Sequence, residues 1–192
     1  MTTKLILASA SPRRVELLNQ MQLEFEQQIA DIDEIHRSGE SAEEFVCRLA
    51  LEKAQAIKEK NESEVAVLGS DTIVVLNEEI LGKPENKQQA AEMLSLLSAK
   101  THQVMTAVSL VTAVNEQTLI NISEVTFMPL SNEMIEAYLA TGESMDKAGA
   151  YAVQGIAAQF ITEIKGSYSG IMGLPLYETR CLLKDGGIKL VV

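Results

Sequence analysis

The chain has 192 residues and a formal net charge of -11, so it is long enough for one sizeable core and too acidic for a broad nucleic-acid surface. With four Phe, four Tyr and no Trp, it offers few side chains on which single-stranded bases could stack. No apolar run approaches the ~20 residues of a membrane-spanning helix, and the stretch after Lys4 is too short for a signal peptide. The isolated Cys47 and Cys181 favour reduced thiols. We therefore expect a cytoplasmic protein that binds neither nucleic acid nor membrane.

The first predicted elements are a short apolar strand at residues 5–7 and a helix over Ser11–Gln20. Ser11 suits the N-cap, and Pro12 suits the first turn, where a missing N–H costs nothing. The free N–H groups of a helix start attract anions, and the guanidinium groups of Arg13 and Arg14 suit phosphate oxygens. A polyphosphate clamp and a solvated basic helix start both explain this pair of arginines.

A strand over Leu23–Ile29 is expected next, followed by an acidic loop. The loop carries Asp31, Asp33 and Glu34, whose carboxylate oxygens suit magnesium or manganese. A plain charged loop explains the same residues equally well. The loop is therefore a candidate metal site with an open alternative.

The second predicted helix begins at Ser41, which forms a capping box with Glu44 three residues later. Apolar residues recur along it at helical spacing. Lys53 lies on this helix beside Arg48 and Glu52, and a solvated helix face is the simplest explanation for all three.

A carboxylate interrupts the most apolar part of the chain. Val65–Leu68 is typical of a buried strand, Gly69-Ser70-Asp71-Thr72 follows, and Ile73–Leu76 is a second β-rich run. Because an unpaired buried carboxylate is costly, Asp71 is a candidate metal ligand, a candidate general base towards water, or both. The alternative is a tight turn in which Asp71 bonds its own backbone.

Lys83 follows a predicted turn at Asn77–Glu79 and a short return strand at Ile80–Leu81. Between Gly82 and Pro84 it could bind phosphate as a point charge, although an ordinary loop lysine is the simpler explanation. The spacing is not that of a P-loop.

The second half of the chain favours antiparallel pairs, so we expect an α/β fold with a mixed, curved sheet. Its predicted elements are a helix over Asn86–Leu97, strands over Thr101–Val114 and Leu119–Phe127 joined at Asn115-Glu116, a helix capped by Ser131, an irregular loop over Asp146–Gly155, a strand over Gln159–Ile164 and a helix over Met172–Lys184.

Basic groups that suit phosphate, together with two carboxylate sites, fit metal-assisted attack of water on a nucleotide polyphosphate. The chain also resembles the Maf-type nucleoside triphosphate pyrophosphatases over essentially its whole length, 1–192, as a single domain. The matching blocks, in order, are Leu7–Arg14, Asp33-Glu34, Arg48–Ala54, Gly69–Thr72, Gly82–Pro84, Asp146–Tyr151, Gln154-Gly155 and Gly173–Pro175.

The resemblance implies an elongated mixed sheet flanked by helices, in two lobes around a central cleft that binds the nucleotide, much as in inosine-triphosphate pyrophosphatases. It implies cleavage between the α- and β-phosphates with a divalent cation, which is magnesium, manganese or cobalt. It implies that Asp71 accepts the proton of the attacking water and that Glu34 and Asp71 hold the metal. It further implies a phosphate-binding set, namely Ser9, Arg13, Arg14, Lys53 and Lys83.

Three positions, Arg13, Thr72 and Gln154, resemble the family branch that acts on dTTP and UTP. This branch implies a house-cleaning hydrolase, and whether its physiological substrate is a normal or a modified pyrimidine triphosphate stays open. A sister branch that acts on 7-methyl-GTP is the alternative substrate class. A nucleotide-sensing inhibitor of septum formation and cell division is the alternative of another kind, and a homodimer stays open.

Overall fold

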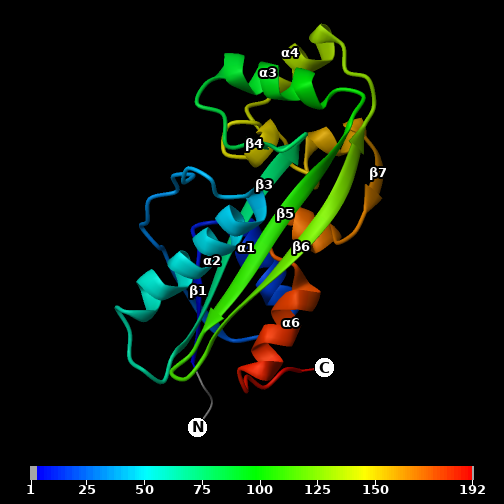
Figure 1. Ribbon diagram of the computed structural model, residues 1–192. Helices are drawn as coiled ribbons and strands as arrows, with labels where there is room; N and C mark the ends of the chain where they lie inside the picture. The colour runs from blue at the N-terminus through cyan, green and yellow to red at the C-terminus, as the bar shows by residue number, and fades with distance from the viewer. Residues whose placement is uncertain (1–3, 192) are drawn as a thin grey trace. The chain divides into compact units, whose positions relative to one another are not determined.

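A computed structural model describes residues 4–191 of the protein (Figure 1). Its helices are α1 (Pro12–Gln20), α2 (Ala42–Lys58), α3 (Lys87–Leu97), α4 (Asn132–Ala140), α5 (Tyr168–Met172) and α6 (Leu176–Asp185), with short 3-10 helices η1 (Ala148–Ala150) and η2 (Ile156–Phe160). Its strands are β1 (Leu5–Ala8), β2 (Phe25–Gln28), β3 (Ala66–Leu76), β4 (Glu79–Leu81), β5 (Thr101–Val111), β6 (Glu116–Phe127) and β7 (Ile161–Lys165).

The strands form a mixed sheet. Within residues 4–191, seven strands pair in the order β2-β1-β3-β5-β6-β7, with β4 beside β3. β1 is parallel to β2 and to β3, whereas the pairs β3–β4 and β6–β7 are antiparallel. The predicted α/β class with a mixed sheet is thereby confirmed.

The chain divides into two compact units. The first comprises Met1–Asp71, Thr106–Asn121 and Gly173–Val192, and the second comprises Thr72–Met105 and Ile122–Met172. The expectation of a single domain with a nucleotide cleft between two lobes stays a prediction.

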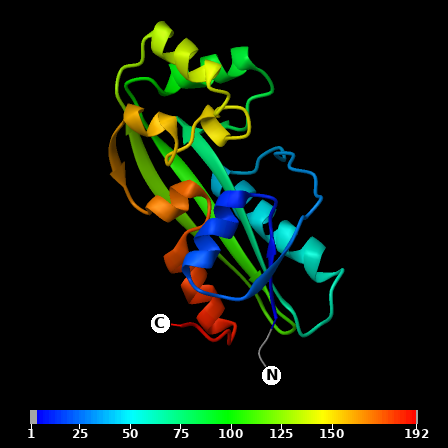
Figure 2. The same cartoon turned by 180° about the vertical axis from the view of Figure 1, so that it is seen from behind.

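In the first unit, helices cover both faces of the parallel strands. Figure 1 shows α2 on one face, and Figure 2 shows α1 and α6 on the opposite face. Because side chains alternate along a strand, Val67 and Gly69 of β3 face α2, whereas Ser70 faces the segment that leads into α6. Ile6 and Ala54 join Val67 in a buried core between β1, β3 and α2.

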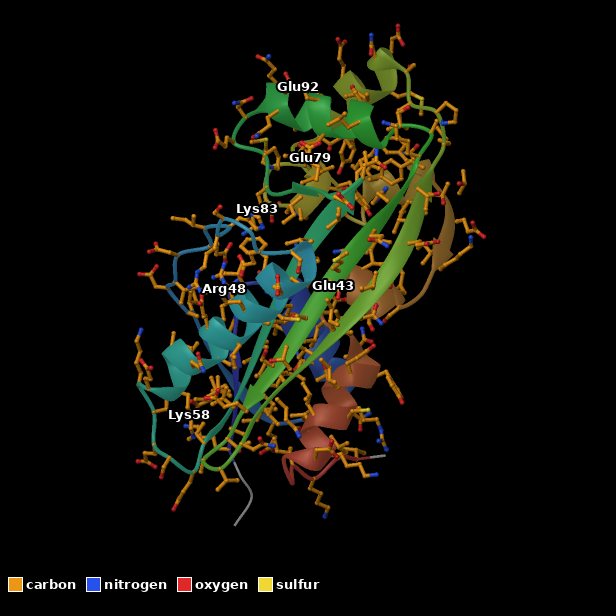
Figure 3. The ribbon with its side chains drawn as sticks, viewed as in Figure 1. Glu43, Arg48, Lys58, Glu79, Lys83 and Glu92 are labelled. Atoms are coloured by element: carbon orange, nitrogen blue, oxygen red, sulfur yellow. The ribbon has the colours of Figure 1, made fainter. Side chains whose placement is uncertain are left out.

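Local signals explain where α2 begins and ends. The hydroxyl of Ser41 accepts from the Glu44 amide at 3.2 Å, while the Glu44 carboxylate accepts from the Ser41 amide at 2.8 Å. The predicted capping box is therefore confirmed. At the other end, the ammonium of Lys58 donates to the carbonyl of Ser63 at 2.6 Å and closes the turn towards β3 (Figure 3).

The segment Gly69-Ser70-Asp71-Thr72 is not a turn. It lies in the middle of β3, a single strand of 11 residues. The expected break between two β-rich runs is therefore wrong, because sheet pairing and close packing against α2 keep this polar stretch extended. Asp71 points towards α2 from a continuous buried strand.

In the second unit, a tight hairpin joins β3 and β4. Asn77 and Glu78 have positive φ values of 49° and 70°, as a type I′ turn requires. Further along, α3 packs against α4 and η1 (Figure 1). Gly149 has a φ of 66°, and a Cβ added there would lie 3.0 Å from the Val74 side chain, so both the backbone conformation and the close packing favour glycine.

The end of the chain differs from the predicted helix over Met172–Lys184. Two helices occupy this region, α5 up to Met172 and α6 from Leu176, with Gly173 between them at a φ of 118°. A residue in this conformation cannot continue a right-handed helix. Pro175 stands at the N-cap of α6, which explains why the second helix begins there.

We expect Gly69→Ala to destabilise the protein. A Cβ at position 69 would collide with the Ala50 carbonyl oxygen and lie 2.8 Å from the Ala54 amide nitrogen, and both are backbone atoms of α2. Such overpacking typically costs ~1–3 kcal/mol of unfolding free energy, measurable by urea denaturation. Gly82→Ala is the matched control, because its Cβ would meet open space among the described residues. Equal stability of the two variants would contradict this packing.

Candidate active site

Three charged side chains of the first unit meet in one ion-pair cluster. The ammonium of Lys53 on α2 lies 2.6 Å from Oδ1 of Asp71 on β3 and 2.5 Å from Oε1 of Glu34 in the loop before α2. Lys53 is 8% exposed and Asp71 7%, whereas Glu34 is exposed. Because one buried ammonium binds both carboxylates, the two acidic groups converge on a single point. The solvated-face explanation is wrong for Lys53.

Packing between α2 and β3 brings Lys53 to Asp71. Gly69 lies on the same face of β3 as Asp71 and allows the helix backbone at Ala50 and Ala54 to approach closely. Lys53 follows the same apolar side of α2, so its stem is buried and its ammonium reaches the strand. The close packing of α2 on β3 therefore explains why a lysine is buried on this side of the helix.

A second group of contacts forms where β1 ends. The hydroxyl oxygen of Ser9 accepts from the Ser11 amide at 3.1 Å and from Nη1 of Arg14 at 3.3 Å. Nε of Arg14 donates to the Gly173 carbonyl at 2.7 Å, and the Ser70 hydroxyl lies 3.0 Å from the same oxygen. Arg14 is therefore held on two sides, and the explanation as a solvated basic helix start is wrong for it.

The two groups of contacts share one electrostatic environment. Burial lowers the pKa of the Arg14 guanidinium, the negative charges of Asp71 and Glu34 oppose that shift, and the charge of Arg13 adds to it. Lys53 and Arg14 thus both feel the charges of Asp71 and Glu34, on a chain whose formal net charge is -11. Cationic side chains gathered at one place on an acidic protein favour a small anionic ligand.

The donor set fits a divalent cation that a phosphate ligand also coordinates. Magnesium is commonly bound by one or two carboxylates plus substrate phosphates. Asp71 and Glu34 supply two carboxylates at one point. Among residues 4–191, no cluster of three or more His, Cys, Asp or Glu side chains forms a closed metal cage. Two carboxylates are thus the oxygen donors that this site offers to a cation bound together with phosphate.

Arg48 fixes the loop that carries Glu34, a role that the sequence did not reveal. Its guanidinium donates to Glu40 at 2.6 and 2.8 Å, to Glu52 at 3.0 Å and to the Ile35 carbonyl at 3.0 Å. Figure 3 shows Arg48 projecting from α2 towards this loop. The only sequence signal was the Arg48–Glu52 pair at helical spacing, since the contacts with Glu40 and Ile35 depend on the path of the loop.

The second unit holds the other candidate residues. Thr72 directly follows Asp71 and is half-buried, while Lys83 and Gln154 are exposed. Lys83 follows β4 (Figure 3), and the carbonyl of Gly82 accepts from the Gly149 amide at 3.1 Å. The structure thus brings the Lys83 segment beside the Asp146–Tyr151 block.

We expect the Glu40–Arg48 pair to make stability depend on pH. Hydrogen bonding to Arg48 is the main reason why the pKa of Glu40 falls from 4.5 to about 2. A carboxyl whose pKa is lower in the folded state stabilises the fold at any pH above its pKa in the unfolded chain. This stabilisation is lost as the pH falls through the pKa of the folded state. The melting temperature of Glu40→Gln should be about 1–4 °C below that of the unchanged protein at pH 7.

This difference should shrink as the pH is lowered from about 5 towards 2, and calorimetry across that range measures it. Glu43→Gln, at an exposed position on the first turn of α2, is the control and should show a smaller effect. A difference for Glu40→Gln that stays constant with pH would contradict the pairing.

Comparisons with known proteins place these features in context. A model of the family described as Maf-like protein matches residues 4–186. A dTTP/UTP pyrophosphatase of Colwellia psychrerythraea is 50% identical over 188 residues, 96% of this chain and 89% of that protein. One of Salmonella typhimurium is 54% identical over 183 residues, 94% of this chain and 92% of that protein.

Among solved structures, a nucleoside-triphosphatase, or dITP/XTP pyrophosphatase, of Mycobacterium abscessus aligns with a TM-score of 0.45 and 18% identity. The alignment covers 65% of this chain and 74% of that chain. In the part of the chain that the structure describes, no helix combines the length and the hydropathy needed to cross a membrane.

Proposed function

The chain belongs to the Maf family, and from this premise we propose that it hydrolyses dTTP and UTP to the nucleoside monophosphate and pyrophosphate. The relatives that carry the name dTTP/UTP pyrophosphatase are 50% and 54% identical and match nearly the whole chain. The observation that carries the chemistry is the convergence of Asp71 and Glu34 on Lys53, beside Arg14.

In the proposed reaction, water attacks the α-phosphorus. The water oxygen bonds to that phosphorus, the bond from it to the bridging oxygen of the β-phosphate breaks, and pyrophosphate leaves with the electron pair. Asp71 accepts the water proton at its carboxylate, which makes it the general base. Lys53 positions Asp71, because its ammonium already binds Oδ1 at 2.6 Å.

Cationic groups of the first unit supply the proposed phosphate contacts. Arg13 and Arg14 present guanidinium groups whose planar donors match phosphate oxygens, and Lys53 adds an ammonium. Ser9 supports them because its hydroxyl oxygen accepts from Nη1 of Arg14. Lys83 of the second unit belongs to the proposed set as a point charge at an exposed position after β4.

A divalent cation belongs to the proposal. Magnesium, manganese or cobalt would be held by Asp71 and Glu34, whose oxygens converge on the Lys53 ammonium. When bound, the cation supplies charge neutralisation on the phosphate oxygens. The two carboxylates would position it.

Base selection is assigned to Arg13, Thr72 and Gln154 by the family resemblance. A side-chain amide carries both a donor and an acceptor, so Gln154 can pair with the N3–H and C4 carbonyl edge of uracil or thymine. The exposed position of Gln154 in the loop before η2 leaves its amide accessible. The names of the near relatives favour this branch over the one that acts on 7-methyl-GTP.

We expect Asp71→Asn to abolish turnover while nucleotide binding survives. The amide keeps nearly the same shape and one oxygen acceptor for Lys53, but it cannot take the water proton. Loss of a general base typically lowers the rate ~10²–10⁴-fold. Pyrophosphate release with UTP and manganese measures turnover, and calorimetric titration measures binding. Near-normal turnover of the variant would show that Asp71 is not the base.

We expect the unchanged protein to cleave dTTP and UTP well and CTP poorly, because the N4 amino group of cytosine reverses the edge that Gln154 would read. Gln154→Ala should flatten this preference more than it lowers the overall rate, since a mismatched base otherwise leaves polar groups unpaired. Values of kcat/KM for a nucleotide panel decide the matter. If 7-methyl-GTP is the best substrate, the pyrimidine assignment is wrong.

A further inference from the structure

A single carboxylate in the second unit binds the backbone of the segment that follows Gln154. Glu143 accepts from the amide of Ile156 through Oε2 at 2.8 Å and from the amide of Ala157 through Oε1 at 3.3 Å. The hydroxyl of Tyr138 also donates to Oε1, at 3.0 Å. Three donors thus meet one half-buried carboxylate, and none of these contacts is part of the reaction described above.

Gly155 makes room for this carboxylate. A Cβ at position 155 would collide with both side-chain oxygens of Glu143, and these oxygens are already bound by backbone amides. Glu143 therefore occupies the space that any other residue at position 155 would fill. The glycine in the Gln154-Gly155 block is explained by the carboxylate that packs against it.

The other side of the same loop is also anchored. The amide of Gly155 donates to the Ala152 carbonyl at 3.1 Å, which closes a turn around Gln154. Just before this turn, buried Tyr151 shares a hydrogen bond of 2.7 Å with Nε2 of His102. Burial lowers the pKa of His102 to about 4, so this link does not change charge near neutral pH.

Gln154 therefore projects from a turn that is fixed at both ends. Tyr151 anchors the side that precedes it, and Glu143 anchors the side that follows it. Burial, reinforced by the neighbouring Glu143, raises the pKa of Tyr138, so its hydroxyl stays a donor to the carboxylate at neutral pH.

We infer that Glu143 is a positioning residue for base selection: it holds the turn so that the Gln154 amide meets the pyrimidine edge in a fixed orientation. The inference rests on the proposed role of Gln154. A hydrogen-bonding group discriminates between bases only where its donor and acceptor are held in place, and a displacement of about 1 Å can cost ~10²-fold in rate.

The test compares kcat/KM for UTP and CTP in the full-length protein. Glu143→Ala should lower the UTP-to-CTP ratio at least ~10-fold, mainly through a higher KM for UTP, while kcat/KM for CTP changes by less than about twofold. Glu143→Gln keeps one carbonyl oxygen as acceptor and should give an intermediate ratio. Glu136→Ala, which removes an exposed carboxylate from α4, the helix that precedes Glu143, is the control and should leave the ratio unchanged.

A double mutant separates positioning from general damage. If Glu143 acts through Gln154, then Glu143→Ala combined with Gln154→Ala should have the same ratio as Gln154→Ala alone. Melting temperatures identify variants that do not fold, and Glu143→Gln then carries the test.

A ratio retained within about twofold in Glu143→Ala, or an equal loss for both nucleotides, would overturn the positioning role. If the unchanged protein releases pyrophosphate from no nucleoside triphosphate, the proposed function fails before the variants are compared, and this inference fails with it. A selective protein whose preference depends on Gln154 but not on Glu143 would overturn the inference alone.

Discussion

The buried ammonium of Lys53 is the interaction on which the candidate site depends. It binds two carboxylates, Asp71 and Glu34, that would otherwise repel each other, and it allows Asp71 to be buried in the middle of a strand. Removing one member of a buried ion pair typically costs several kcal/mol, because the remaining charge stays desolvated. Two features keep this cluster assembled. One is the close approach of α2 to Gly69, and the other is the bond from Arg48 to Glu40 that fixes the loop before α2.

Local chemistry made much of the first unit predictable. The capping box at Ser41 places the start of α2 within one residue, and Pro12 marks the first turn of α1. In the second unit, the predicted turn after β3 is confirmed, and Asn77 is a residue type that tolerates the positive φ found there. Asp71 was identified as a functional candidate because a buried carboxylate is expensive, and the structure gives it a buried lysine as its partner.

The wrong predictions have a common cause: partners that are distant in sequence decide the local conformation and burial of these residues. Gly69 and Ser70 are typical turn residues, yet the neighbouring strand and the closely packed helix hold them extended. Lys53 lies on the apolar side of α2, but its partners Asp71 and Glu34 are distant in sequence, so helical spacing alone does not reveal its ion pairs. Gln154 is predictable as a site residue only through the family resemblance, since neither its spacing nor its neighbours indicate a base pocket.

The hydrogen bonds of the Gly173 carbonyl affect the order in which contacts form while the chain is being synthesised. It accepts from Arg14, 159 residues earlier in the chain, and from Ser70. On the ribosome, β1, α1, α2 and the first half of β3 emerge long before residue 173, so the nascent chain can bury its first helices while Arg14 still lacks this backbone partner. The contacts that hold Arg14 are therefore completed only after residue 173 has been made. A prematurely terminated chain would carry most of the cationic residues without the carbonyl that orients Arg14.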